Sequence, residues 1–107
     1  KPDERAAIVA RLASKDFEDD ATIAAQILGT YGGREAVAGA FFAECVSGSW
    51  SGPASTHWEQ LAETADSIAK RTKLPKLRRW AIDAARELRR MAERDRLREE
   101  EDDLRRD

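Results

Sequence analysis

Cysteine and histidine, which form disulfides and bind zinc, are scarce in this sequence. Its 107 residues include one cysteine, Cys45, and one histidine, His57. A disulfide within the chain is therefore excluded, and a zinc site built from cysteine and histidine would lack most of its usual ligands. We expect no cofactor and no metal, and a fold held together by packing and hydrogen bonds.

Long apolar segments are also absent. No run approaches the roughly eighteen apolar residues of a membrane-spanning helix, and no basic segment followed by an apolar stretch marks a signal peptide. We therefore expect a cytoplasmic protein without membrane contact. The chain begins at Lys1 instead of methionine, which suggests a processed product, a fragment of a longer protein or a boundary chosen by an experimenter.

Large aliphatic residues are few as well. Leu, Ile, Val and Phe together number 19, a fraction low enough to raise the question of disorder. The net charge is only -2, however, and 19 alanines supply small apolar positions that let helices pack closely. We expect one helical domain over residues 1–107. Its thin core, over about 4–92, should depend on three Trp and three Phe, and a charged helical extension should follow over about 93–107.

Apolar residues at helical spacing predict two short helices in the first third of the chain. The first opens with acidic residues and should end near Ser14. Its inward face is predicted to contain Ile8, Val9 and Leu12. The acidic run 18–20 is expected to cap the start of the second helix, and Gly32-Gly33 to end it. The inward stripe of this helix is predicted to contain Ile23, Ala24, Ile27, Leu28 and Tyr31.

Residues 34–46 predict a third helix that is apolar around most of its circumference. Helices of this kind are normally buried, so we expect this one to be the central element of the fold. Cys45 lies on it and is expected to be a small core residue and not a reactive thiol.

Residues 47–55 have the Gly, Pro and Ser content of an ordered loop and include Trp50. We favour Trp50 as a plug that packs the loop onto a helix; the alternative is an exposed anchor for a partner. Thr56 and Glu59 have the spacing of a capping box, so a fourth helix should begin there and run to about Thr72. Its buried face is predicted to contain Trp58, Leu61, Ala65 and Ile68.

A fifth helix is predicted to begin at Pro75, because proline is tolerated in the first turn of a helix. Its inner stripe is predicted to contain Leu77, Trp80, Ala81, Ala84, Leu88 and Met91. We expect the fourth and fifth helices to form a tight hairpin in which Trp58 and Trp80 meet.

Beyond Met91 the stripe becomes polar, so the fifth helix should leave the core there and continue as a solvated rod. Weak pairs at helical spacing are expected to support it: Glu101 with Arg105, and Asp102 with Arg106.

Residues 56–91 resemble a HEAT repeat, with a helix, a short turn and a proline-led helix that contains Arg78-Arg79-Trp80-Ala81. Together with Phe41-Phe42, the loop 47–57 and the charged tail, they are similar to the C-terminal end of HEAT-like regions in large bacterial multidomain proteins. Some of those carry P-loop NTPase modules and act in conflict, or defence, systems. The resemblance implies an all-α solenoid fragment of about five helices in antiparallel pairs, whose polar tail caps a longer solenoid.

Basic residues gather at the turn between the fourth and fifth helices, and no acid occurs between Asp66 and Asp83. This basic turn consists of Lys70, Arg71, Lys73, Lys76, Arg78 and Arg79. Converging there, these side chains could contact phosphate or an acidic partner. The reading we favour is that the Lys and Arg near the end of the fourth helix complement its dipole while Arg78 and Arg79 are solvated.

Signals for catalysis are weak. The segment 48–52 has the glycine spacing of a nucleophile elbow, but Trp50 stands where serine is needed and no strand precedes it. His57 lies near the serines of this loop, yet an exposed first-turn position is the better interpretation. Adjacent acids in 19–20 and 99–103 diverge on a helix and chelate poorly. We therefore expect a non-enzymatic protein.

Three functional hypotheses remain. The first is a protein–protein interaction or scaffold module that forms the C-terminal part of a larger bacterial protein and can oligomerise through the fifth helix. The second is a nucleic-acid-binding domain that uses the basic turn, which predicts retention that falls with salt. The third is an antitoxin-like regulatory protein whose charged tail folds on a toxin or neighbouring subunit. Under the first, truncation after Met91 should leave folding largely intact.

Overall fold

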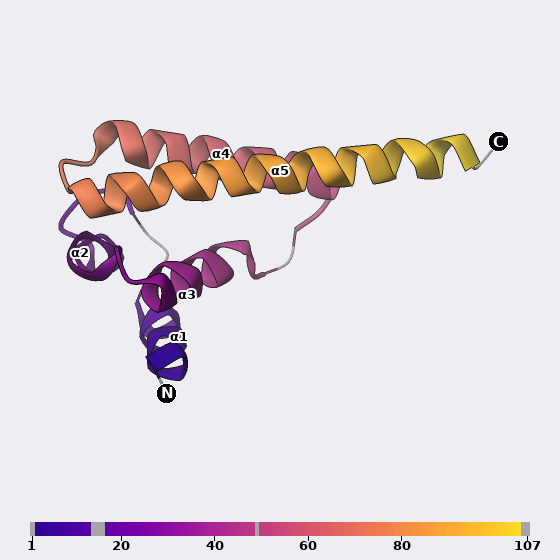
Figure 1. Cartoon of the computed structure of the whole chain (residues 1–107). Helices are drawn as coiled ribbons and strands as arrows, with labels where there is room; N and C mark the ends of the chain where they lie inside the picture. The colour runs from indigo at the N-terminus through magenta and orange to yellow at the C-terminus, as the bar shows by residue number, and fades with distance from the viewer. Residues whose placement is uncertain (1, 14–16, 49, 106–107) are drawn as a thin grey trace.

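The computed structural model describes residues 2–13, 17–48 and 50–105, and within these ranges it is all-helical (Figure 1). The helices are α1 (Pro2–Leu12), α2 (Ile23–Tyr31), α3 (Glu35–Val46), α4 (Ala54–Arg71) and α5 (Pro75–Arg105). No strand occurs in the described ranges, so the all-α prediction is confirmed. The molecule is elongated, with principal extents of 52, 32 and 21 Å.

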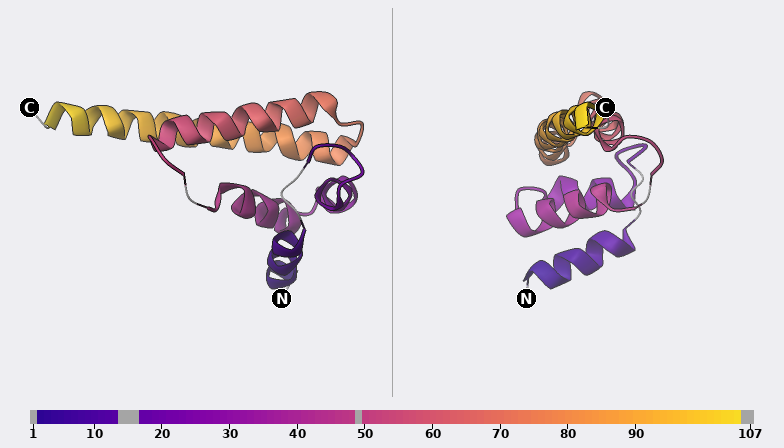
Figure 2. Two further views of the ribbon diagram at one scale, coloured as in Figure 1. Left: turned by 180° about the vertical axis from the view of Figure 1, so that it is seen from behind. Right: turned by 90° about the vertical axis from the view of Figure 1, so that its right-hand side faces the viewer.

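The α4–α5 hairpin is the framework of the molecule. The two helices lie side by side and run in opposite directions, joined by residues 72–74 (Figures 1 and 2). Alanines dominate the seam between them, so the two backbones approach closely. The buried apolar residues are Trp58, Ala62, Ala65 and Ile68 of α4, and Leu77, Trp80, Ala81, Ala84, Ala85, Leu88 and Ala92 of α5. This agrees closely with the two predicted stripes, except that Leu61 and Met91 are half-buried.

The start of α4 differs from the prediction. The helix begins at Ala54, with Pro53 as its N-cap residue and no side-chain capping bond. The capping box of Thr56 and Glu59 is therefore wrong, because Thr56 already lies inside the first turn. Pro53 fixes the backbone before the helix, and its carbonyl accepts the first bond, from the His57 N–H at 3.3 Å. The predicted start of α5 at Pro75 is confirmed.

The three N-terminal helices lie on one side of the hairpin (Figure 2). α2 packs against α5 and crosses it steeply, since Figure 1 shows α2 nearly end-on. Gly29 of α2 lies next to Leu74 in the connection before α5, since a Cβ at position 29 would lie 2.8 Å from Leu74 Cδ1. α1 packs mainly against α3. Antiparallel pairing is thus seen for α4 and α5, and for the other helices it stays a prediction.

The caps of α2 are partly as predicted. Its N-cap residue is Thr22, whose hydroxyl accepts the Ala25 N–H at 3.2 Å. The expectation that the acidic run 18–20 caps the helix is therefore wrong: Asp19 accepts the Ala21 N–H at 2.8 Å and closes the turn before it. Gly32 ends the helix as predicted, and a side chain there would overlap the Leu28 carbonyl oxygen.

The inward face of α1 was predicted wrongly. Leu12 is 81% exposed and Ile8 55% exposed, and the buried residues in this part of the chain are Ala6, Ala10 and Ala13. The small alanine face allows α1 to lie close to α3. In α2 the predicted stripe is confirmed for Ala24 and Leu28, which are buried together with Ala25, and is wrong for Ile23 and Tyr31, which are exposed.

The prediction that 34–46 forms the central element is also wrong. Phe41 is the buried residue of α3, and most other apolar positions on this helix are half-buried. α3 packs against α1 and, less extensively, α2, while the hairpin supplies the centre of the fold. A direct link to α5 is the Trp80 Nε1–H, which donates to the Ala38 carbonyl at 3.1 Å. Cys45 is half-buried.

Trp58 and Trp80 are both buried, but they do not meet. The Trp58 Nε1–H donates to Asp95 Oδ2 at 2.7 Å, and Asp95 lies about 22 Å along the helix from Trp80. Trp80 instead stacks on Phe17, with ring centroids 5.6 Å apart. In an antiparallel hairpin, residues near the free end of one helix face the free end of the other, so Trp58 faces the distal half of α5.

Contacts of α5 with α4 continue past Met91. Besides the bond from Trp58 to Asp95, Glu99 accepts the Ser55 hydroxyl at 2.7 Å, and Arg96 forms an ion pair with Glu59. The polar residues of α5 that follow Met91 thus pack against α4 for two further helical turns. After Glu99 the helix projects alone (Figure 1). Among the described residues no ion pair joins Glu101 to Arg105, and Arg106 lies outside them.

Candidate functional site

The basic turn is brought together, but most of its side chains bind the protein itself. Arg71 donates to the Phe17 carbonyl, and Lys76 Nζ donates to the Thr30 carbonyl at 2.9 Å. Arg79 pairs with Asp83 at 3.4 Å. The hydrogen bond from Arg89 lowers the pKa of Asp66, and the charge of Lys70 acts in the same direction.

Arg78 acts as a side-chain cap for α4. Its Nε donates to the Ala69 carbonyl at 3.2 Å and its Nη2 to the Thr72 carbonyl at 2.6 Å. These carbonyls lie at the C-terminal end of α4, where backbone acceptors lack helical partners and a cation is favourable. A basic residue thus complements the helix end, but it is Arg78, which the favoured reading of the sequence had expected to be solvated.

Asp20 fastens the segment before α2 to the same turn. Its carboxylate accepts the Thr72 hydroxyl at 2.6 Å and the Lys73 N–H at 2.9 Å. These two hydrogen bonds, helped by the nearby Arg71 and Lys73 charges, lower the pKa of Asp20. Asp20 thus offsets part of the positive charge of the turn, and Arg71, Lys76 and Arg78 have donors engaged by carbonyls of the protein itself.

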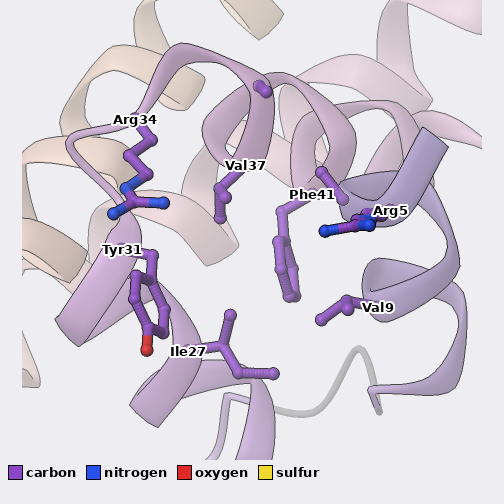
Figure 3. A pocket seen from close by; sticks show the side chains of 9 residues that line it. Arg5, Val9, Ile27, Tyr31, Arg34, Val37 and Phe41 are labelled. Atoms are coloured by element: carbon purple, nitrogen blue, oxygen red, sulfur yellow. The ribbon is translucent and has the colours of Figure 1, made fainter. Parts of the chain in front are cut away.

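A groove between α1, α2 and α3 has a volume of about 710 Å³ (Figure 3). Its lining is mainly apolar and comes from all three helices. The lining residues are Arg5, Ala6, Val9, Ile27, Tyr31, Arg34, Ala36, Val37 and Phe41. α1 contributes Arg5, Ala6 and Val9 to this lining.

Two arginines flank this apolar lining. Figure 3 shows Arg34 beside Tyr31 on one side of the groove and Arg5 beside Val9 on the other. The Arg34 guanidinium carbon lies 5.4 Å from the Tyr31 ring centroid, a cation–π distance. Within the described residues, neither arginine forms an ion pair with a carboxylate. An apolar trough with two uncompensated cations suits an apolar ligand that carries negative charge.

Trp50 lies at the opposite end of the hairpin from the basic turn. Its indole stacks parallel on His57, with centroids 4.3 Å apart, and also contacts Trp58. It thus packs the loop onto α4 while remaining 40% exposed. His57 Nε2 is buried without a hydrogen-bond partner among the described residues, so His57 is not the exposed side chain that was expected.

The groove residues were missed by sequence reasoning, apart from a general role for α3. Val9 and Tyr31 were assigned to a closed core, and Arg5 and Arg34 carried no visible signal. One sign was available: a helix as apolar as 34–46 needs apolar cover on several sides, and the two short helices before it offer little.

Features of a reaction centre are limited. No group of three or more His, Cys, Asp or Glu side chains in the described ranges is arranged to hold a metal ion. In the loop that resembled a nucleophile elbow, Ser49 lies outside the described residues, whereas Gly48 and Gly52 have positive φ values of 112° and 89°. Those two glycines shape a connection before α4 and no strand leads into it.

Comparison with models of protein families, with curated proteins and with solved structures gives no match to this chain. Among the helices that the structure describes, none combines the length and apolar content needed to cross a membrane.

Proposed function

We propose that this protein is a non-enzymatic docking module that binds an amphipathic helical segment of a protein partner in the α1–α2–α3 groove. The observation that supports this most strongly is the pairing of a mainly apolar lining with Arg5 and Arg34. Helix-in-groove recognition uses apolar anchors about one turn apart, and the surrounding charges select the partner.

The difference in packing between the α4–α5 hairpin and the N-terminal helices supports the same proposal. The α4–α5 hairpin has a continuous buried seam, whereas α1 and α3 each keep apolar surface beside the groove. A rigid support with an adjacent apolar trough is typical of small-molecule and peptide binding sites. We expect the bound peptide to be helical, because the groove is open and lies between helices.

The experiment is selection from a displayed library of helical peptides against the intact protein. We expect enriched peptides to carry acids beside apolar residues at helical spacing, and to bind the Arg5→Glu/Arg34→Glu variant at least about tenfold more weakly. Arg86→Glu, an exposed arginine of α5, is the matched control and should bind normally. Enriched peptides that bind both variants equally, or no enrichment at all, would contradict the proposal.

A HEAT-like solenoid origin, as the end of a larger bacterial defence-associated protein, remains a separate proposal. Its support is the resemblance of residues 56–91 and the observed order of helix, three-residue connection and proline-led helix. Nucleic-acid binding by the basic turn also stays a prediction, which the internal hydrogen bonds of Arg71, Lys76 and Arg78 weaken.

A further inference from the structure

The last two to three turns of α5, from Leu97 onward, carry an unpartnered amphipathic face. Leu97 is 56% exposed and Leu104 is 77% exposed. Seven residues make about two helical turns, so these leucines lie on one face about 10 Å apart. Glu100 and Glu101 lie between them on the same face, three and four residues from each leucine.

The charge of this end is unbalanced. Residues 97–104 contain five carboxylates and one guanidinium. Glu99 binds Ser55, but neither Glu100 nor Glu101 pairs with a cation within the described residues. A helical face with two leucines and two free glutamates is complementary to an apolar groove with two free arginines.

The fold keeps this end away from its own groove. α5 is an unbroken helix of 31 residues, and Figure 1 shows its C-terminal end at the far side of the molecule from α1 and α2. Docking within one chain would require the helix to break and fold back. The complementary surfaces can therefore meet only between molecules.

Resting on the proposed function, we infer that the groove receives the α5 end of a second copy of this chain. Leu97 and Leu104 enter the apolar lining, while Glu100 and Glu101 face Arg5 and Arg34. The contact is head-to-tail, because each copy contributes a different surface. Such an interface leaves one groove and one helix end free, so it continues from copy to copy unless a ring closes.

Analytical ultracentrifugation of the full chain tests the inference. We expect the average mass to rise with concentration between about 10 μM and 1 mM, and to fall when salt is raised. Two double variants, Leu97→Ser/Leu104→Ser and Arg5→Glu/Arg34→Glu, should each remain monomeric. Ile82→Ser and Arg86→Glu, matched exposed positions on α5, should associate like the unaltered chain.

A charge exchange makes the test specific for this pair of surfaces. The Arg5→Glu/Arg34→Glu variant and a Glu100→Arg/Glu101→Arg variant should each be monomeric alone and assemble when mixed. Circular dichroism of every variant should show unchanged helix content, since all the altered side chains lie on the surface.

Three outcomes would overturn the inference. They are a chain that is monomeric throughout the concentration range, a mixture of exchanged variants that fails to assemble, and association that depends on the leucines but not on the arginines. The last outcome would indicate pairing of two α5 ends. If self-association fails while the groove still selects acidic helical peptides, the proposed function stands and its occupant is another protein.

Discussion

At the scale of single residues, Asp20 is a carboxylate whose charge stabilises the fold. The Thr72 hydroxyl and the Lys73 N–H bind its charged form and lower its pKa in the folded state. Because the folded pKa lies below the unfolded value, this stabilisation is complete above about pH 4 and is lost as the pH falls through the folded pKa.

We predict that Asp20→Asn lowers the thermal midpoint at pH 7 and reduces the loss of stability between pH 4 and pH 2. Thermal melts followed by circular dichroism across this range measure both effects. Asp102→Asn, on the exposed part of α5, is the control and should keep the original pH dependence. Identical pH profiles for Asp20→Asn and the unaltered protein would contradict the assignment.

A second residue-level prediction concerns the bond between Trp58 and Asp95. Trp58→Phe retains an aromatic ring but removes the N–H, which leaves a half-buried carboxylate without its donor. A hydrogen bond to a charged group contributes about 1.5 to 3 kcal/mol, and the free energy of unfolding in urea should fall by that amount. Trp50→Phe, at an exposed ring, should change it by less than about 0.5 kcal/mol. Equal effects of the two substitutions would argue against this role.

At the scale of elements, the end of α4 depends on Arg78 more than on its neighbour Arg79. Arg78→Ala removes two bonds to backbone carbonyls and should lower the free energy of unfolding by about 1 kcal/mol. Arg79→Ala removes a surface ion pair and should cost less than about 0.5 kcal/mol. Urea denaturation of both variants gives the comparison.

A fourfold variant of the basic turn tests nucleic-acid binding. Replacement of Lys73, Lys76, Arg78 and Arg79 together by alanine should reduce stability. If nucleic acid binds this turn, the same replacement should also abolish retention that falls steeply with salt. Retention that is unchanged in this variant would remove the basic turn as a nucleic-acid site.

Truncation of α5 distinguishes its packed part from its projecting part. Removal of all residues after Met91 deletes the partners of Trp58, Ser55 and Glu59, so the expectation of largely intact folding is revised. We now predict a loss of about 3 kcal/mol for that truncation. Removal of residues after Glu101 should cost less than about 1 kcal/mol, because the seam ends at Glu99. Similar denaturation midpoints for the two truncations would contradict the extended seam.

At the scale of the whole molecule, stability should be uneven. α4 and α5 share the longest buried seam, while α1 packs mainly on α3. Hydrogen exchange should therefore show amides of α1 about 100-fold less protected than those in the middle of the hairpin, since local opening needs less free energy than global unfolding. Mass spectrometry of deuterated peptides measures this, and uniform protection would indicate a single cooperative unit.

The sequence predicted the helices of this fold better than their arrangement. Proline at position 75 and apolar residues recurring every three or four positions located the hairpin, since these signals are local. The faces of α1 and α3 were misjudged because pattern reading ranks Ile8 and Leu12 above alanine, whereas close packing of two short helices favours Ala6 and Ala10.

The candidate site was less predictable than the fold. The basic turn was visible as a run of charge, but its partners, such as Asp20 and the Phe17 carbonyl, lie about fifty residues away along the chain. The groove joins Arg5 to Arg34 through three helices, and no spacing rule connects such positions. Both features depend on tertiary contacts that a single sequence does not encode in its periodicity.

Because α5 is a continuous helix, it also fixes the distance between the groove of one molecule and its own docking end. If successive copies join through its end, the helix sets their spacing as a ruler would. Insertion of seven residues after Arg96 would move Leu97 and Leu104 together, leave them pointing in nearly the same direction and increase the interval between neighbours by about 10 Å, at the loss of the bond between Glu99 and Ser55. Insertion of two residues would instead turn them about 200° away from the groove, so assembly should be lost although every contacting side chain is still present.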